Sequence, residues 1–539
     1  MRWADLVEPR LTWASLIRLV AMAFMPFVLI AVVNWYWGSP DVLDTARVMV
    51  VAEGPAAAEE VLIDHLERKP GDVDAWLLLF EIRFLGLDTS DLMQTVRESI
   101  EVLKKLESRG EPRRSWRSKE ELVALIDRAV GIPADVLRSY VDVQERGLAA
   151  GLDRLDPVPG ALARRVSSIL CERRGDQDGA ARYAEAWFRA DPTPAAAEAW
   201  FRLTRLTRGQ DAARRLLDEE GVERALPSEI PYKIALEEGR VVDAARWAIV
   251  SHYETWTWSL LIGSFVILFA WGGTLVHLAG AWRWGSTGVA LMVVAVVLGI
   301  ASADLTLGVV VIMDELWPID KKGGVPATLL LSLAIGVREE LVKLLCFVPL
   351  ALVCRGRPPI HSLLIASLVG LGFAVSENTV YYEMSRGLAV PARFLTANFL
   401  HAGLTGLAGC YLVDAMRGGG ERWHTFLSEL SKVIAIHAAY DFFLIEPSLR
   451  EYSIVSSIFL IVLAQQYLRF FRQLAPKGMR RPPMTRVFLV GVTVAFGVHY
   501  LYMATQYGPA DALPKTGMQA SVLAITAIVY FREFGERVE

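Results

Sequence analysis

A series of long apolar runs constrains this chain more than any other feature of its sequence. From Trp256 onward, nine such runs follow one another, near 256–276, 287–312, 326–352, 361–382, 392–413, 425–446, 453–470, 487–503 and 517–531. Most of them approach the roughly 20 residues that an α-helix needs to cross a bilayer. Because backbone polar groups in lipid must be satisfied within the segment, these runs predict transmembrane helices.

A further apolar run, from Leu16 to Trp37, precedes a long polar segment. It is longer than the core of a signal peptide and no convincing small-residue cleavage site follows it, so we interpret it as an uncleaved signal anchor. About ten spans result, in agreement with a hydrophobic content of 53%, which is high for a soluble chain. The predicted class is all-α: a polytopic transmembrane bundle with a soluble helical domain.

The basic residues between the runs predict the orientation, because Lys and Arg near span ends are retained on the cytoplasmic side. The densest cluster lies between two of the last spans and comprises Arg469, Arg472, Lys477, Arg480, Arg481 and Arg486. With this cluster and the N-terminus inside, residues 38–250 are expected to be extracytoplasmic. The predicted location is the cytoplasmic (inner) membrane, with the lipid bilayer as surroundings.

A short phrase recurs within the polar segment 38–250. Asp178-Gly-Ala-Ala-Arg182, Asp211-Ala-Ala-Arg214 and Asp243-Ala-Ala-Arg246 place their arginines 32 residues apart, a period typical of stacked helical hairpins. The segment resembles tetratricopeptide (TPR) repeats; the alternative is a generic helical domain rich in Ala and Arg. A repeat domain would offer a concave face to a protein partner.

The predicted organisation has five parts: a signal-anchor helix (1–37), a soluble TPR-like domain (38–250), linking transmembrane helices (251–325), a four-helix membrane core (326–446) and C-terminal transmembrane helices (447–539). The net charge is −4 and no dense basic stripe occurs, so we expect no nucleic-acid partner. The four cysteines have no CxxC spacing, which argues against a disulfide framework or a cysteine-ligated metal.

Ionisable residues in the middle of the predicted spans are the strongest indication of function, because each costs about 2.5–3.5 kcal/mol on insertion if it is unpaired. The first group is Glu339, Glu340 and Lys343. The lysine lies four and three residues after the two glutamates, so it can neutralise part of their charge on one helix face. One negative charge would remain for chemistry. The alternative is a structural ion pair between helices.

Three further groups follow on the next three predicted spans. Glu377 lies on a span that also carries Gly370 and Gly372, small residues that let helices approach closely. His401 lies on the next span, and His437 and Asp441 lie on the last. The four-residue spacing of this last pair lets the aspartate accept a hydrogen bond from the imidazole and fix its tautomer.

The depth of these residues links the four groups. Counted from the predicted span ends, Glu340, Glu377, His401 and His437 all fall between the middle and the outer third of the membrane. The sequence therefore predicts one site, built by four consecutive helices and located toward the extracytoplasmic side.

The ordered motifs Glu339-Glu340-x-x-Lys343, Phe373-x-x-x-Glu377-Asn378, His401 and His437-x-x-x-Asp441 resemble the PrsW family of intramembrane proteases. This family is related to the CAAX prenyl endopeptidases and the abortive-infection membrane proteases. The resemblance implies hydrolysis of a peptide bond in a membrane-anchored protein, such as an anti-sigma-factor-like regulator. It covers roughly residues 326–446 and implies nothing about the large N-terminal domain.

Amide hydrolysis needs an activated water, stabilisation of the oxyanion and a proton for the leaving amine. Either glutamate of the first pair can act as the general base, and the resemblance favours Glu339, with Glu340 and Lys343 shaping its charge. Glu377, His401 and His437 would provide a two-histidine, one-carboxylate site for Zn²⁺ with a fourth position open for water. In a metal-free alternative, the same histidines and Asp441 position the water.

Two other functions compete with a protease. A proton- or ion-coupled transporter also uses intramembrane Glu, His and Lys, but it predicts internal symmetry and broken helices, whereas the polar residues here are confined to one block of four spans. A non-catalytic scaffold would require the loss of a key residue, and every motif residue is present.

Overall fold

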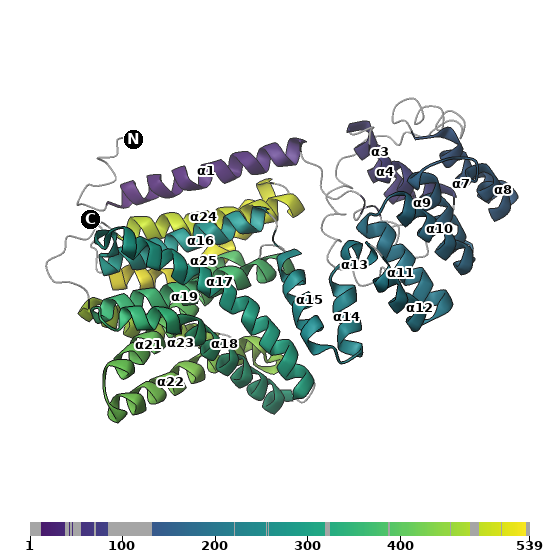
Figure 1. Cartoon of the computed structure of the whole chain (residues 1–539). Helices are drawn as coiled ribbons and strands as arrows, with labels where there is room; N and C mark the ends of the chain where they lie inside the picture. The colour runs from purple at the N-terminus through teal and green to yellow at the C-terminus, as the bar shows by residue number, and fades with distance from the viewer. Residues whose placement is uncertain are drawn as a thin grey trace. The chain divides into compact units, whose positions relative to one another are not determined.

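The computed structural model describes residues 12–37, 55–68, 72–84, 132–219, 221–254, 258–317, 324–385, 389–452, 454–474, 484–507 and 509–534, with the single positions 43, 46 and 256. Regular structure in these ranges is helical and contains no strand (Figure 1), so the all-α class is confirmed for the described part of the chain. Much of the predicted domain 38–250 lies outside these ranges, as do Lys477, Arg480 and Arg481 of the basic cluster.

The chain divides into two compact units: Asn34–Glu238, called the helical unit below, and Met1–Val33 with Gly239–Glu539, called the membrane unit. The sequence places the boundary near residue 250, twelve residues later. The difference is due to α15 (Val241–Glu254), which packs against α17 (Gly285–Leu316) of the membrane unit. The Tyr253 hydroxyl at the end of α15 donates a hydrogen bond of 2.6 Å to Asp304 Oδ2 on α17.

The helical unit is a succession of short amphipathic helices. They are α3 (Pro55–Arg68), α4 (Val73–Phe84), α7 (Ala134–Arg146), α8 (Leu148–Leu155), α9 (Ala161–Arg173), α10 (Gln177–Ala190), α11 (Pro194–Arg208), α12 (Gln210–Arg215), α13 (Val222–Ala225) and α14 (Glu229–Glu237). Local signals set their starts: the Asp176 carboxylate caps α10 by accepting the Gly179 amide at 2.9 Å, and Pro194 begins α11. Consecutive helices pack pairwise and bury apolar clusters between them.

The three copies of the recurring phrase occupy equivalent positions. They lie on α10, α12 and α15, and each of these helices follows a glycine with positive φ, namely Gly175, Gly209 and Gly239. Glycine adopts this conformation without the steric cost that a side chain would bring, so each phrase begins a helix just after a tight turn. This arrangement agrees with helical hairpins, whereas the TPR-like assignment itself stays a prediction.

The membrane unit contains the long apolar helices together with two shorter helices, α15 and α20. Besides α15 and α17 these are α1 (Trp13–Trp37), α16 (Trp258–Ala279), α18 (Gly324–Cys354), α19 (Pro359–Met384), α20 (Val390–Leu395), α21 (Ala397–Arg417), α22 (Gly420–Ile445), α23 (Ile454–Leu474), α24 (Met484–Tyr507) and α25 (Pro509–Phe534). Five segments of the described residues are long and apolar enough to cross a membrane: Ala14–Val32, Gly285–Leu316, Pro359–Tyr382, Val390–Arg417 and Thr485–Ala504. Nine of the predicted spans each correspond to one helix, whereas the predicted span 392–413 is divided at Thr396 into α20 and α21, and the count of ten spans stays a prediction.

Glycines bring the central helices into close contact, as the small residues of the sequence predict. A Cβ on Gly299 of α17 would lie 2.1 Å from the Val369 carbonyl oxygen of α19, and one on Gly372 would lie 2.3 Å from that of Val296. Only glycine permits this backbone approach. The α19 helix is thereby fixed between α17 and α21, at the centre of the unit (Figure 1).

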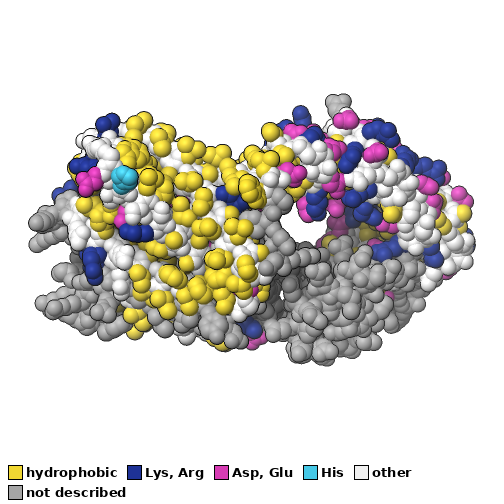
Figure 2. Space-filling view, turned by 90° about the horizontal axis from the view of Figure 1, so that it is seen from below, with side chains coloured by type: hydrophobic (Ala, Val, Ile, Leu, Met, Phe, Trp, Pro, Cys, Tyr) yellow, Lys and Arg dark blue, Asp and Glu magenta, His cyan; other side chains and the backbone are white. Residues whose placement is uncertain are grey.

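The surfaces of the two units differ in composition. On the face shown in Figure 2, the membrane unit presents mainly hydrophobic side chains, whereas the helical unit presents many charged ones. The exposed apolar residues of α17 and α18 include Val289, Val293, Val297, Leu329, Leu333, Leu341 and Leu345. An apolar surface of this extent is typical of a protein in contact with lipid.

Candidate functional site

The four helices of the predicted core bring all seven predicted site residues into one cluster. Glu339, Glu340 and Lys343 lie on α18, Glu377 on α19, His401 on α21, and His437 and Asp441 on α22. The four helices lie side by side (Figure 1). Glu340 and Lys343 are completely buried, and His401 and His437 retain only 3% and 1% of their exposure. Burial at this level requires that each polar group has a partner.

The Glu340 carboxylate is fully engaged. Its Oε1 accepts a hydrogen bond of 2.9 Å from Lys343 Nζ and one of 2.8 Å from His437 Nδ1, and its Oε2 accepts one of 3.3 Å from Thr405 Oγ1. No face of this carboxylate is exposed. The role that follows is orientation: Glu340 fixes the imidazole of His437 and the ammonium of Lys343.

His437 presents its second nitrogen to the centre of the cluster. In a neutral imidazole whose Nδ1–H donates to Glu340, Nε2 carries the lone pair, and Asp441 is then a neighbour of this nitrogen rather than the acceptor of its hydrogen. That nitrogen lies 3.7 Å from Glu339 Oε2 and 3.4 Å from Asp441 Oδ2. The predicted proximity of His437 and Asp441, one turn apart on α22, is present in the structure.

His401 has the complementary arrangement. Its Nε2 lies 3.0 Å from Glu377 Oε2, which accepts the hydrogen bond. Its Nδ1 lies 3.9 Å from Glu339 Oε2 and accepts a hydrogen bond of 2.9 Å from Lys343 Nζ. Each histidine is therefore held by a carboxylate on its outer nitrogen and turns the other nitrogen toward Glu339.

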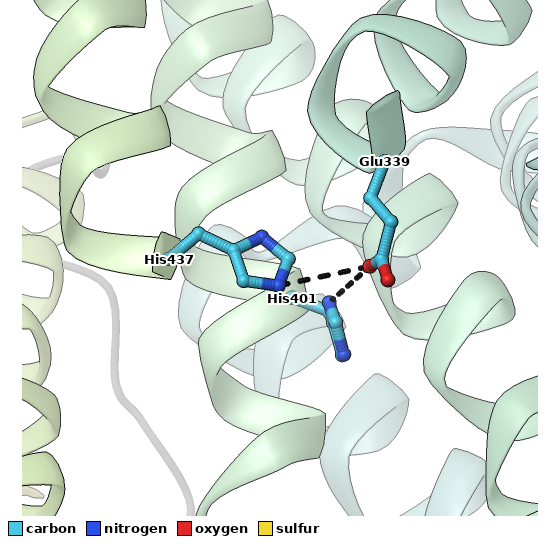
Figure 3. Close-up of side chains that lie close together, drawn as sticks. All are labelled: Glu339, His401 and His437. Carbon is cyan, nitrogen blue, oxygen red and sulfur yellow. Dashed lines mark ion pairs between the residues drawn. The ribbon is translucent and has the colours of Figure 1, made fainter. Parts of the chain in front are cut away.

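The Glu339 carboxylate faces both imidazoles, from His401 and His437 (Figure 3). Among the described residues, Glu339, His401 and His437 form the one group whose ligand atoms all lie within 4.8 Å of one another in a geometry that could hold a metal ion. Ligand atoms about 2 Å from a zinc ion lie at most about 4 Å apart, and the two measured separations from Glu339 Oε2, 3.7 and 3.9 Å, agree with that limit. Two neutral imidazoles and a carboxylate are a donor set typical of zinc.

Glu377 occupies a different place from the one expected of a metal ligand. It lies on the outer side of His401, and its Oε2 also accepts a hydrogen bond of 2.5 Å from Arg393 Nη2. A histidine that gives one nitrogen to Glu377 has only the other to offer to a metal. The geometry therefore associates Glu339, rather than Glu377, with the inner nitrogens of the two histidines.

Lys343 connects the two halves of the cluster. Its ammonium donates to Glu339 Oε2 at 3.2 Å, to Glu340 Oε1 and to His401 Nδ1, which uses all three of its hydrogens. It also lies 4.0 Å from the centre of the Phe373 ring, a favourable position for a cation. The Phe of the second motif thus contributes to the site through Lys343.

The backbone at the site is packed as tightly as in the rest of the core. A Cβ on Gly370 of α19 would lie 2.2 Å from the carbonyl oxygen of His401 on α21. Glycine at this position sets the distance between the helix that carries Glu377 and the helix that carries His401.

The sequence analysis missed two residues of the site. Arg393, on the short helix α20, bonds Glu377 and Asn378; in the sequence it stands at the end of an apolar run, where an interfacial arginine is ordinary. His252 does not belong to a group of ionisable residues within an apolar run, yet its Nε2 lies 2.9 Å from Ser376 Oγ, next to Glu377 in the chain. Only the packing of α15 against the later helices of the membrane unit reveals this contact.

One comparison with known proteins gives a match, and the matched residues include the candidate site. Residues 287–465 match the model of the PrsW family of intramembrane metalloproteases. No match is found among curated proteins or among solved structures. The matched residues include the whole cluster and leave out the helical unit, α1, α16, α24 and α25. The match supports assignment of this part of the chain, residues 287–465, to the PrsW family.

Proposed function

We propose that this protein is an intramembrane protease that hydrolyses a peptide bond of a membrane-anchored protein. The observation that carries the proposal is the position of the Glu339 carboxylate. It lies within 4 Å of one nitrogen of His401 and one nitrogen of His437, and the other nitrogen of each ring is bonded to a second carboxylate. Such carboxylate–histidine pairs orient imidazoles for proton transfer or for metal binding. The family match to residues 287–465 supports the same activity.

The chain's own residues divide the chemistry among them. Glu339 and Asp441 are the carboxylates nearest to His437 Nε2, so one of them can accept the proton of a water held between them. Lys343 donates to Glu339 Oε2 at 3.2 Å, so its positive charge lies beside this carboxylate and can stabilise the oxyanion. In the version without a metal on Nε2, His437 can be protonated in the course of the reaction and deliver the proton to the leaving amine.

A divalent metal fits this site by donor type, geometry and charge. Four carboxylates, those of Glu339, Glu340, Glu377 and Asp441, face two fixed cations, Lys343 and Arg393. With neutral imidazoles and ionised carboxylates, a dication balances the cluster. We propose Zn²⁺, held by Glu339, His401 and His437. Such an ion would polarise the scissile carbonyl and acidify a bound water.

The metal-free alternative assigns the same atoms differently. Lys343 Nζ already bonds two of the three ligand atoms, Glu339 Oε2 and His401 Nδ1, so the ammonium and a metal ion compete for them. In this version Glu339 is the general base. Zinc analysis of the purified full-length protein decides between them: we expect about one equivalent that is removed, together with activity, by a chelator. Activity that persists in protein free of metal would exclude the metal version.

The protease assignment is tested by cleavage of a single-span membrane protein in cells or proteoliposomes. Glu339→Gln, His401→Ala and His437→Ala should each abolish cleavage, while Glu429→Gln provides a matched control. Glu429 lies on α22 as His437 does, but it pairs with exposed Lys432, 2.7 Å away. Full activity of the three site variants would contradict the proposal, and proton transport without cleavage would favour the transporter.

Substrate recruitment and location complete the proposal. We infer an extracytoplasmic position for the helical unit, in the cytoplasmic membrane, so the substrate would be cut near the outer face of its span. Deletion of residues 45–245 should then reduce cleavage of natural substrates more than cleavage of a short single-span peptide. Equal cleavage of every substrate by the deleted chain would show that the helical unit has no part in recruitment.

A further inference from the structure

Arg393 is a buried cation that the family match and the motifs leave without a role. Its side chain is only 13% exposed, and all of its contacts in this region lie on one turn of α19. Nη2 donates to Glu377 Oε2 at 2.5 Å, Nε donates to Asn378 Oδ1 at 2.7 Å, and the guanidinium lies 3.9 Å from the centre of the Tyr381 ring. A planar guanidinium suits this combination of two directed bonds and a stacked ring.

The backbone that carries Arg393 is tied into the same network. The Asn378 Nδ2 group donates to Asn398 Oδ1 at 2.8 Å, and Asn398 Nδ2 donates to the Arg393 carbonyl oxygen at 2.6 Å. The three residues therefore form a closed ring of hydrogen bonds, from the arginine side chain through two asparagines and back to its own backbone. Asn378 and Asn398 are completely buried, so the ring is shielded from water.

Helices outside the matched residues hold α20 from the other side. Trp271 Nε1 on α16 donates to the Phe394 carbonyl oxygen at 2.7 Å, and the Tyr530 hydroxyl on α25 donates to that of Leu395 at 2.9 Å. Both aromatic side chains are buried, and their rings lie 5.2 Å apart. The two carbonyls directly after Arg393 are thus fixed by helices at opposite ends of the membrane part of the chain.

The position of Arg393 affects His401, because both residues bond the same carboxylate of Glu377. The Oε2 atom that bonds Arg393 is the atom that accepts the His401 Nε2 hydrogen at 3.0 Å. Holding this carboxylate in place keeps the proton on Nε2 and leaves Nδ1 free of it, on the side of Glu339. An arginine also supplies the positive charge that a carboxylate at this depth needs.

We propose that Arg393 is a positioning residue of the site: it fixes the Glu377 carboxylate on His401, and α16 and α25 fix Arg393 through the backbone of α20. The proposal rests on the proposed function only for its effect on cleavage, since the orientation of His401 is a property of the chain itself. In this way α16 and α25 influence the site through α20, although neither helix contributes a residue to the cluster.

The test uses full-length protein in nanodiscs with Arg393→Gln, Arg393→Lys, Glu377→Gln and the double variant Arg393→Gln/Glu377→Gln. The ¹⁵N spectrum of labelled histidine, with His401→Ala for assignment, reports the tautomer of His401. We expect the Nε2–H form in the parent protein and a mixture of tautomers in Arg393→Gln. Zinc affinity, measured by competition with a chelator, and kcat should both fall about 10- to 100-fold, with KM little changed and partial recovery in Arg393→Lys.

Two comparisons separate positioning from a general loss of structure. The double variant should lose no more than Glu377→Gln alone, because both changes break one connection. Tyr530→Phe, which keeps the ring and removes the bond to Leu395, should cause a smaller loss in the same direction. Arg417→Gln removes a guanidinium that bonds the backbone carbonyls of Cys354, Arg355 and Arg357 and should change neither tautomer nor affinity.

The outcomes distinguish the two proposals. An unchanged His401 tautomer in Arg393→Gln, or losses in the double variant that simply add, would overturn the positioning role. A parent protein that neither binds zinc nor cleaves any peptide would overturn the proposed metalloprotease instead, while the tautomer measurement would still decide the role of Arg393.

Discussion

Ion pairs in the helical unit and in the membrane unit use the same side chains under opposite conditions. In the helical unit, Lys233 and Glu229 pair at 2.6 Å with 64% and 68% of their side chains exposed. In the membrane unit, Lys343 and Glu340 pair at 2.9 Å with no exposure at all. The first pair is solvated whether or not it forms, whereas the second has no water to replace a lost partner.

Because of this difference, loss of a charge should affect stability little in the exposed pair and strongly in the buried pair. An exposed pair contributes about 0–1 kcal/mol, since water and salt screen it. Removal of one partner from a buried pair costs about 3–5 kcal/mol, because an uncompensated charge remains. A buried network of this kind is worth its cost in stability where it orients reacting groups, as we propose for Glu339, His401 and His437.

The largest effect in this comparison of buried and exposed ion pairs is expected at Lys343. Lys343→Met removes three hydrogen bonds from two glutamates and a histidine, and should destabilise the membrane unit by about 3–5 kcal/mol. Unfolding of the full-length protein in nanodiscs, followed by the accessibility of its buried cysteines, measures the loss. Lys233→Met is the control and should leave this unfolding unchanged. Equal stability of the two variants would mean that the buried cluster is not the charged network described above.

A second change separates stability from chemistry within the glutamate pair. Glu340→Gln loses charge on a carboxylate that accepts three bonds, so it should cost about 1.5–3 kcal/mol of stability. Glu339→Gln, at a side chain that is 12% exposed, should cost less stability but lower cleavage by about 10²- to 10⁴-fold. Parallel measurement of unfolding and cleavage checks the division. A Glu339 variant that loses stability and keeps activity would reverse the roles of the two residues.

A third change tests the packing that positions the site. Gly370→Ala places a methyl group against the His401 carbonyl oxygen, 2.2 Å from the ideal Cβ position, so α19 and α21 must move apart. A displacement of this kind should reduce cleavage about 10- to 100-fold while the protein stays folded. Gly263→Ala on α16 is the control, because its Cβ would meet nothing closer than 3.7 Å. The same cleavage rate in both variants would show that the separation of the two helices does not limit the reaction.

The site could be predicted from sequence to the extent that its residues stand out against lipid. Charges at Glu339, Glu377 and His437 are conspicuous in apolar runs, and their order on successive helices placed them at one depth. The pairing of nitrogen and oxygen atoms was not accessible, because it depends on rotamers and on helix rotation. Thus Glu377 was expected to bind metal, whereas it lies on the outer nitrogen of His401.

The parts that were missed depend on contacts between distant segments. Arg393 reaches Glu377 from a six-residue helix whose place is set by α16 and α25, and no local pattern encodes that. His252 lies 124 residues before its partner Ser376. In the helical unit, by contrast, the turn glycines and the recurring phrase are local signals, so its helical character could be predicted, while its TPR-like class stays a prediction.

The smallest effect is expected for an exposed ion pair of the helical unit that is joined by two hydrogen bonds. Arg202 on α11 donates to both carboxylate oxygens of Glu172 on α9, at 2.5 and 2.9 Å, with 51% and 32% of the side chains exposed. Arg202→Lys removes this two-bond geometry and should cost no more than about 0.5–1 kcal/mol, less at high salt because the pair is screened. Thermal unfolding of the full-length protein at two salt concentrations measures it, with exposed Arg205→Lys on the same helix as control. A larger loss of stability that does not depend on salt would mean that solvent does not compensate charges in this unit. The difference between this pair and Lys343 would then be due to the geometry of the pairs rather than to their burial.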